Sequence, residues 1–219
     1  MKTIIFDMDG LMFDTEKLWL KCFKETGKEM GYNLSFELHD KTIGANKNIM
    51  EKILKEELGN GFPFEEFYDK YIDLMTKTIN KEGVKPKKGL IELLDYLNNN
   101  NYILAIASST KKETIKKHLE KNNIEGKIFK VIVSGENITN GKPAPDIFIE
   151  TCKKLSINPN EVIVLEDSNN GIKAAYTAGC IPILIPDINI ITKETREMAK
   201  YEFKDLTKVI DFLENYTAK

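Results

Sequence analysis

The chain has 219 residues, of which 42% are hydrophobic, so it can bury a substantial core and does not have the composition of a disordered sequence. Its 32 basic and 34 acidic side chains leave a formal net charge of −2 without a long run of one sign, which argues against nucleic acid or an anionic membrane as a partner. No apolar run is long enough for a signal peptide or a bilayer span, so we expect a cytoplasmic protein.

The first part of the chain predicts one strand followed by a long helical stretch. The apolar run 4–6 is rich in β-branched residues and predicts a buried strand. The hydrophobic period is then helical from Trp19 to Ile79, which predicts an all-helical inserted domain. Its boundaries are expected near Asp14 and near Val84, where polar residues and a glycine interrupt the period.

The remainder of the chain alternates between strand and helix patterns. Further strands are predicted at 103–107, 131–133, 162–165 and 181–185. Helical stripes separate them, and this alternation is typical of a parallel α/β sheet. We therefore expect an α/β core domain made of 1–13 and 85–219, interrupted after its first strand by a helical cap domain at 14–84.

Polar side chains follow the predicted strands at the points where the strands end. They are Asp7 and Asp9, Ser108 and Ser109, and Glu166 and Asp167, and Lys142 stands before a later helix. Ligands of an open parallel sheet bind beyond the carboxyl ends of its strands, so we expect these groups to converge. Crowded carboxylates repel one another unless a cation is present, and oxygen ligands suit Mg²⁺. Hydroxyls and an ammonium beside the metal make the site complementary to a phosphate.

Helix ends and isolated residues near these motifs have simpler interpretations. Thr110 and Glu113 have the spacing of a capping box, which predicts a helix N-terminus beside the same phosphate. Ser168 is interpreted mainly as the cap of the following helix. His39 and His118 lack a matching carboxylate pattern, so surface positions are expected for both.

Four motifs resemble the haloacid dehalogenase superfamily, in the branch that contains β-phosphoglucomutase and many small-metabolite phosphatases. In the family's order they are Phe-Asp-Met-Asp-Gly-Leu at 6–11, Ala-Ser-Ser-Thr at 107–110, Gly-Lys-Pro-Ala-Pro-Asp at 141–146 and Leu-Glu-Asp-Ser-Asn-Asn-Gly at 165–171. The resemblance extends over essentially the whole chain. It implies a Rossmann-like parallel sheet core with an inserted all-helical cap domain.

The resemblance also implies a mechanism for the acidic residues. Asp7 would attack phosphorus to give an aspartyl-phosphate, and Asp9 would protonate the leaving group and later deprotonate the acceptor. Mg²⁺ would be held by Asp7, the main-chain carbonyl of Asp9 and Asp167, with Glu166 as a further ligand or an orienting neighbour. A phosphatase acting on a small phosphorylated metabolite follows from this set, and a sugar phosphate is the expected substrate.

The resemblance assigns binding roles to residues of both predicted domains. Ser108, Ser109 and Lys142 would bind the phosphoryl group. Thr15 belongs to the run 14–19, which resembles that of sugar-phosphate phosphatases, and we expect it to contact substrate. A monomer is expected.

Two positions distinguish a phosphatase from a mutase. In β-phosphoglucomutases a histidine assists the acceptor hydroxyl, and an arginine of the cap binds the second phosphate. The matching positions here are Trp19, which takes no proton, and Lys47, which lacks the planar fork of arginine, so hydrolysis is favoured although both are kept as substrate-binding candidates. A mutase and a non-enzymatic phosphate sensor remain the alternatives.

Overall fold

The computed structural model describes residues 3–43 and 45–217, without the side chains of 82, 216 and 217. Within these residues a six-stranded parallel sheet has the strand order β3-β2-β1-β4-β5-β6. The strands are β1 (Thr3–Phe6), β2 (Ile103–Ser108), β3 (Phe129–Ser134), β4 (Val162–Glu166), β5 (Ile181–Leu184) and β6 (Tyr201–Glu202). The five predicted strands are confirmed, and β6 was missed because two residues are too few to show a hydrophobic period.

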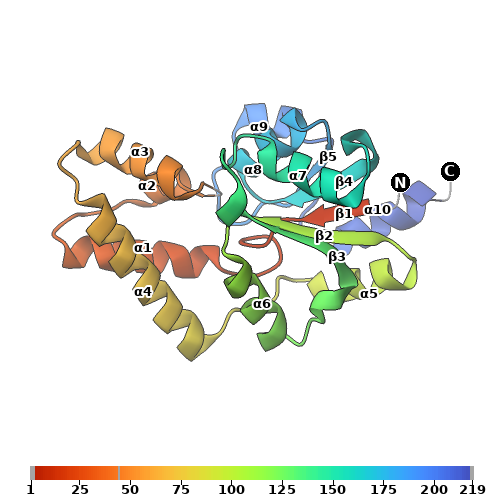
Figure 1. Cartoon of the computed structure of the whole chain (residues 1–219), viewed down its shortest axis with the longest axis horizontal. Helices are drawn as coiled ribbons and strands as arrows, with labels where there is room; N and C mark the ends of the chain where they lie inside the picture. The colour runs from red at the N-terminus through yellow and green to blue at the C-terminus, as the bar shows by residue number, and fades with distance from the viewer. Residues whose placement is uncertain (1–2, 44, 218–219) are drawn as a thin grey trace.

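Helices cover both faces of this sheet (Figure 1). They are α5 (Leu90–Asn99), α6 (Lys112–Lys121), α7 (Asp146–Leu155), α8 (Asn169–Thr177), α9 (Lys193–Met198) and α10 (Thr207–Thr217). Alternate residues of β1 point to opposite faces, so Ile4 packs into the apolar cluster beneath α5, α6 and α10, and Ile5 into the cluster beneath α7 and α8. Short 3₁₀ turns lie at Gly126–Ile128, Gly135–Asn137 and Pro159–Glu161.

The segment between β1 and α5 is helical, as predicted, and lies beyond one end of the sheet in Figure 1. It comprises α1 (Glu16–Glu29), α2 (Phe36–Asp40), α3 (Lys47–Leu58) and α4 (Phe64–Glu82). These helices share their own apolar cluster, in which the ring of Phe23 packs edge-on against Phe67 and Tyr71 at centroid distances of 5.5 and 6.0 Å. None of the described helices has the length and apolar character needed to cross a bilayer.

The chain enters and leaves this helical segment at neighbouring points. Phe13 forms an antiparallel bridge with Pro86, and the backbone N–H of Asp14 donates to the carbonyl of Lys85 at 2.9 Å. The helical segment thus has its own apolar cluster and is joined to the sheet by two adjacent connections, here called the crossings, near Phe13 and Pro86. Both features support the proposed division into a core domain and a cap domain at 14–84.

Candidate active site

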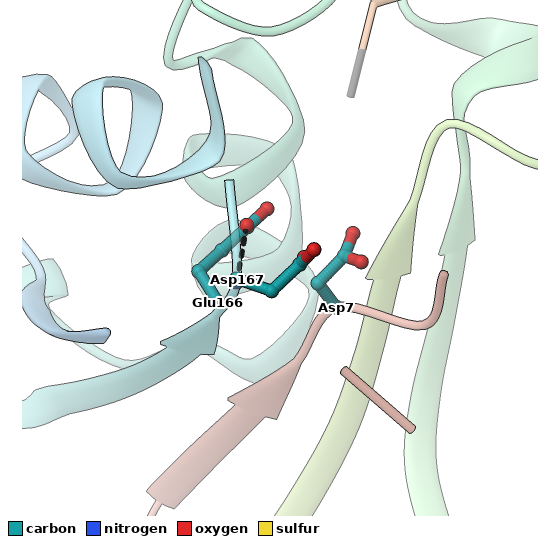
Figure 2. Close-up of side chains that lie close together, drawn as sticks. All are labelled: Asp7, Glu166 and Asp167. Atoms are coloured by element: carbon teal, nitrogen blue, oxygen red, sulfur yellow. Dashed lines mark hydrogen bonds between the residues drawn. The ribbon is translucent and has the colours of Figure 1, made fainter. Parts of the chain in front are cut away.

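Asp7 stands at the carboxyl end of the central strand β1. Because Phe6 pairs with Ile106 of β2 and with Leu165 of β4, the next residue of each strand reaches the same edge of the sheet. Asp7 therefore lies beside the end of β4, where Glu166 and Asp167 project from the strand and the turn after it (Figure 2). The three carboxyl groups offer oxygens within 4.8 Å of one another, and all three residues are buried.

The turn after β1 brings the backbone close to these carboxylates. Gly10 has φ of +82°, a left-handed conformation that favours glycine, and its N–H donates to the carbonyl of Phe13 at 3.0 Å. A Cβ atom on Gly10 would lie 2.2 Å from Oδ2 of Asp167 and 3.0 Å from Cγ of Glu16. Gly10 is therefore required by its φ angle and by the close approach of two acidic side chains.

Lys142 is the buried cation of the site. Its ammonium bonds to Oδ1 of Asp7, lies 2.6 Å from Oε1 of Glu166 and lies 5.0 Å from the ring centroid of Phe148. Burial alone would lower the pKa of Lys142, but the attraction of Asp7 and Glu166 outweighs it and holds that pKa above its ordinary value. The side chain is therefore a fixed positive charge that touches two carboxylates.

Glu166 uses both of its carboxylate oxygens inside the protein. Oε1 accepts from Lys142, and Oε2 accepts from the N–H of Asp167 at 2.9 Å and from the N–H and hydroxyl of Ser168, each at 3.0 Å. Ser168 also caps α8 by accepting from the N–H of Gly171 at 3.0 Å, as predicted. Glu166 thus orients Lys142 and the turn that carries Asp167.

The charges of this cluster do not balance. The pKa of Asp7 is raised to about 8, first because the group is buried, although Lys142 opposes the rise, and then because Glu166 and Asp9 repel its charge. Burial, followed by repulsion from Glu166 and Asp7, raises the pKa of Asp167 well above its ordinary value. One ammonium thus faces three buried carboxylates, and an oxygen-only donor set with excess negative charge suits a hard divalent cation.

Asp9 is half-buried and contacts the end of β2. Its Oδ2 accepts a hydrogen bond from the Thr110 hydroxyl at 2.6 Å and a long one from the Ser108 hydroxyl at 3.5 Å. The Ser108 oxygen in turn accepts from the N–H of Thr110 at 3.1 Å. Ser109, between them, is half-buried at the same edge of the sheet. The residues of the first two motifs are therefore in direct contact.

The predicted capping box at Thr110 and Glu113 is wrong. Helix α6 begins at Lys112, and no side chain in the described part of the chain caps its N-terminus. The Thr110 hydroxyl bonds to Asp9 instead, and the Glu113 carboxylate pairs with Lys117 at 2.9 Å. A spacing rule describes contacts within one helix end and cannot detect an acceptor that lies far away in the sequence, in the turn after β1.

Of the three remaining candidate residues, Thr15 bonds to the turn beside the acid cluster of Asp7, Glu166 and Asp167, whereas Lys47 and Trp19 contact residues of the helical segment. Thr15 is fully buried, and its oxygen accepts from the N–H of Gly10 at 3.1 Å. The Lys47 ammonium pairs with Glu65 at 2.6 Å and lies 4.7 Å from the ring centroid of Tyr68. Trp19 is half-buried and packs edge-on against Tyr71 at 5.7 Å, and among the described residues its Nε1 has no hydrogen-bond partner.

Sequence patterns missed several groups around Asp167. Glu16 is only 5% exposed, and burial, followed by repulsion from Asp9 and Asp187, raises its pKa well above the ordinary value. Its place directly after Asp14 and Thr15 was the available signal. Asn189 donates to Oδ2 of Asp167 at 2.9 Å, but it lies in a loop without any periodic or motif signal.

The expectation that both histidines lie at the surface is also wrong. His39 is 2% exposed and His118 is 1% exposed. Their rings pack edge-on against Phe23 at 5.1 Å and Phe13 at 5.5 Å, respectively. Burial lowers the pKa of both, to about 4 for His39, because the charged imidazolium is disfavoured away from water.

Comparison with known proteins agrees with the family resemblance and with the observed fold. Residues 4–185 match the haloacid dehalogenase-like hydrolase family. The chain is 32% identical to the phosphorylated carbohydrates phosphatase of Thermotoga maritima over 179 aligned residues. The aligned region covers 82% of each protein. Among solved structures, a hydrolase from Pseudomonas syringae superimposes with a TM-score of 0.86 at 22% identity, covering 98% of this chain and 99% of the other. β-Phosphoglucomutase from Clostridium difficile superimposes with a TM-score of 0.80 at 20% identity over the whole of both chains.

Proposed function

We propose that this chain, which belongs to the haloacid dehalogenase-like hydrolases, is a magnesium-dependent phosphatase of a small phosphorylated carbohydrate. The observation that carries the proposal is the contact set of Asp7, a buried carboxylate at the end of β1 that bonds to Lys142 and adjoins Asp167. The similarity to the Thermotoga maritima phosphatase supports a phosphorylated carbohydrate as the substrate class.

Asp7 is the proposed nucleophile. Its Oδ1 is held by Lys142, which leaves Oδ2 to attack phosphorus and form an aspartyl-phosphate. The carboxylate must be ionised to attack, yet burial and like charges raise its pKa to about 8. Extra positive charge is therefore needed at the site near neutral pH, and this need supports a metal cofactor.

Mg²⁺ is the proposed cofactor. Asp7, the main-chain carbonyl of Asp9 and Asp167 would hold it, and Glu166 would orient Lys142 rather than bind the ion, because both of its oxygens already accept hydrogen bonds. When bound, the ion would neutralise charge on the transferring phosphoryl group and favour ionised Asp7. Lys142 and Ser108 would contact the same phosphoryl oxygens from the ends of neighbouring elements.

Asp9 is the proposed general acid and base. The hydroxyl of Thr110 donates into Oδ2, so Oδ1 is the oxygen that would carry the proton for the leaving alkoxide. After the alcohol departs, the same oxygen would take a proton from the water that hydrolyses the aspartyl-phosphate. Thr110 thereby fixes which face of Asp9 is turned to the substrate.

Hydrolysis is favoured over phosphoryl transfer to a second sugar. Lys47 is paired with Glu65 and lies over Tyr68, so its charge is already partly neutralised by another side chain. Trp19 takes no proton and cannot assist an acceptor hydroxyl. A mutase would need a group that binds the second phosphate and a group that assists the acceptor hydroxyl. The sequence of the helical segment contains no arginine that could bind the second phosphate.

The test is an incubation with Mg²⁺ and a panel of phosphorylated sugars, followed by phosphorus NMR. The panel includes β-glucose 1-phosphate with a bisphosphate primer, and a parallel sample contains a metal chelator. Inorganic phosphate as the main product, formed only with Mg²⁺, is the expected result. An isomerised sugar phosphate with little free phosphate would identify a mutase instead, and no reaction across the panel would favour a phosphate-binding regulator.

A further inference from the structure

The segment Asp187–Ile190, here called the 187–190 loop, follows β5 at the same edge of the sheet as the acid cluster. No motif covers it, and it has no role in the proposed chemistry. Three of its residues nevertheless bond to three different parts of the molecule: the acid cluster, the helical segment and the crossing between them.

Asn189 holds Asp167. The side-chain amide of Asn189 donates to Oδ2 of Asp167 at 2.9 Å and to its main-chain carbonyl at 3.1 Å. Asn189 is only 9% exposed, so water replaces these bonds poorly. A donor that touches both the carboxylate and the backbone of one residue fixes the direction in which that carboxylate points.

Ile190 binds the helical segment. Its N–H donates to Oδ1 of Asp40, the last residue of α2, at 2.8 Å. Its carbonyl accepts from the side-chain amide of Asn169 at 2.8 Å, so the backbone of Ile190 is held on both sides. The adjacent Asn170 also reaches the helical segment, because its amide donates to the carbonyl of Ile43 at 2.9 Å.

Asp187 binds the returning crossing of the chain. Its carboxylate pairs with Lys87, and the backbone N–H of Lys87 donates to the carbonyl of Met12 at 2.8 Å. The loop is therefore anchored at the crossing and at α2, and Asn189 stands between these two anchors. A shift of the helical segment relative to the sheet must move the loop or break one of these bonds.

We propose that the 187–190 loop links the position of the helical segment at Asp40 to the orientation of Asp167, with Asn189 and Asp40 as positioning residues. The inference rests on the proposed function, since it treats Asp167 as a metal ligand. In this arrangement the acid cluster binds its cation best when Asp40 of α2 accepts the hydrogen bond from Ile190 of the loop. The helical segment then influences the chemistry without any of its side chains touching the metal.

The test measures Mg²⁺ affinity by titration calorimetry without substrate. Asn189→Ala should weaken binding about 10- to 100-fold, as removal of a ligand's orienting partner does. Asp40→Ala should weaken binding about 2- to 30-fold, although Asp40 bonds to the loop and not to the acid cluster. Asp40→Asn keeps the acceptor oxygen and should bind Mg²⁺ like the unmodified chain. Asp73→Ala removes an exposed carboxylate of the same segment and serves as the matched control.

The double variant distinguishes transmission through the loop from general loosening. Once Asn189 is alanine, Asp40→Ala should weaken Mg²⁺ binding no further, because the link is already broken. Unchanged affinity in Asp40→Ala beside a clear loss in Asn189→Ala would overturn the link and leave the metal site intact. If the unmodified chain bound no Mg²⁺, the metal assignment itself would fail, and this inference with it.

Discussion

The acidic residues differ in burial and in their positively charged partners between the helical segment and the strand ends. In the helical segment, several carboxylates pair with lysines at the surface, as Asp73 does with Lys77 one helical turn later. At the strand ends, Asp7, Glu166 and Asp167 are buried together with a single ammonium. Exposed pairs contribute little to stability, whereas buried unbalanced charge destabilises the fold.

This difference indicates where substitutions, pH and cations should act. A charge removed from the helical segment loses one solvent-screened partner. A charge removed from the strand ends changes the protonation, the orientation and the reactivity of every neighbour. We therefore expect the two regions to differ by orders of magnitude in functional effect, in the following order.

The largest effect is expected for Asp7→Asn. The amide cannot attack phosphorus, so activity should fall by at least about 10⁴-fold, as it does when a covalent nucleophile is removed. Phosphate release under saturating substrate and Mg²⁺ measures the loss. Asp95→Asn, an exposed residue of α5, is the matched control and should retain full activity. Substantial activity in Asp7→Asn would refute the proposed mechanism.

Asp9→Asn should reduce turnover of an alkyl phosphate by about 10²- to 10⁴-fold, because the leaving alkoxide receives no proton. With 4-nitrophenyl phosphate the leaving group needs no acid, so the first step should persist while hydrolysis of the aspartyl-phosphate slows. A burst of nitrophenolate equal to the enzyme concentration is the expected signal in stopped flow. Equal slowing of both substrates without a burst would contradict the acid role.

Lys142→Met should destabilise the fold by about 3–5 kcal/mol, because it leaves the carboxylate of Glu166 buried without its cation and removes the partner of Asp7. Chemical denaturation at pH 7 measures the loss. The same measurement at a pH low enough to protonate the carboxyls should show a smaller difference between the variant and the unmodified chain. A loss that does not depend on pH would point to packing against Phe148 instead.

Without Mg²⁺, stability should fall as pH rises from about 7.5 to 8.5, where the histidines of the unfolded chain are already mostly neutral. The pKa of Asp7 is about 8 in the folded chain and ordinarily 3.8, so within this window the unfolded chain binds fewer protons than the folded chain. Thermal melts across the window measure the slope, and Mg²⁺ should reduce it by favouring the ionised form. Asp7→Asn should also reduce it, and an unchanged slope in that variant would exclude Asp7 as the cause.

The smallest effect is expected in the helical segment. Lys47→Met removes the exposed pair with Glu65 and should change stability by less than about 1 kcal/mol. Chemical denaturation of Lys47→Met and Lys142→Met under the same conditions compares the free energy of unfolding after loss of an exposed and of a buried lysine. A loss as large as that of Lys142→Met would contradict the contrast between the two regions.

Much of the fold was predictable because its signals are local. Each buried strand of the parallel sheet is a continuous apolar run, and the four leucines from Leu90 to Leu97 show the helical period of α5. The approach of Asp7 to Asp167 was also predictable, because both follow strands and parallel strands end at one edge. The loop 187–190 was not predictable, since it has neither a period nor a motif.

By itself, the sequence determined strands β1 to β5, the helical insert and the acidic residues that meet at the strand ends, because hydrophobic periods and strand termini are properties of short segments. Only the tertiary structure decided how those residues are used. In the folded chain, the Thr110 hydroxyl donates a hydrogen bond to Asp9, and both oxygens of Glu166 accept hydrogen bonds from internal donors. The Asn189 amide donates to Asp167. These choices depend on which groups remain unpaired after distant segments pack, and buried polar groups take whatever partner lies within reach.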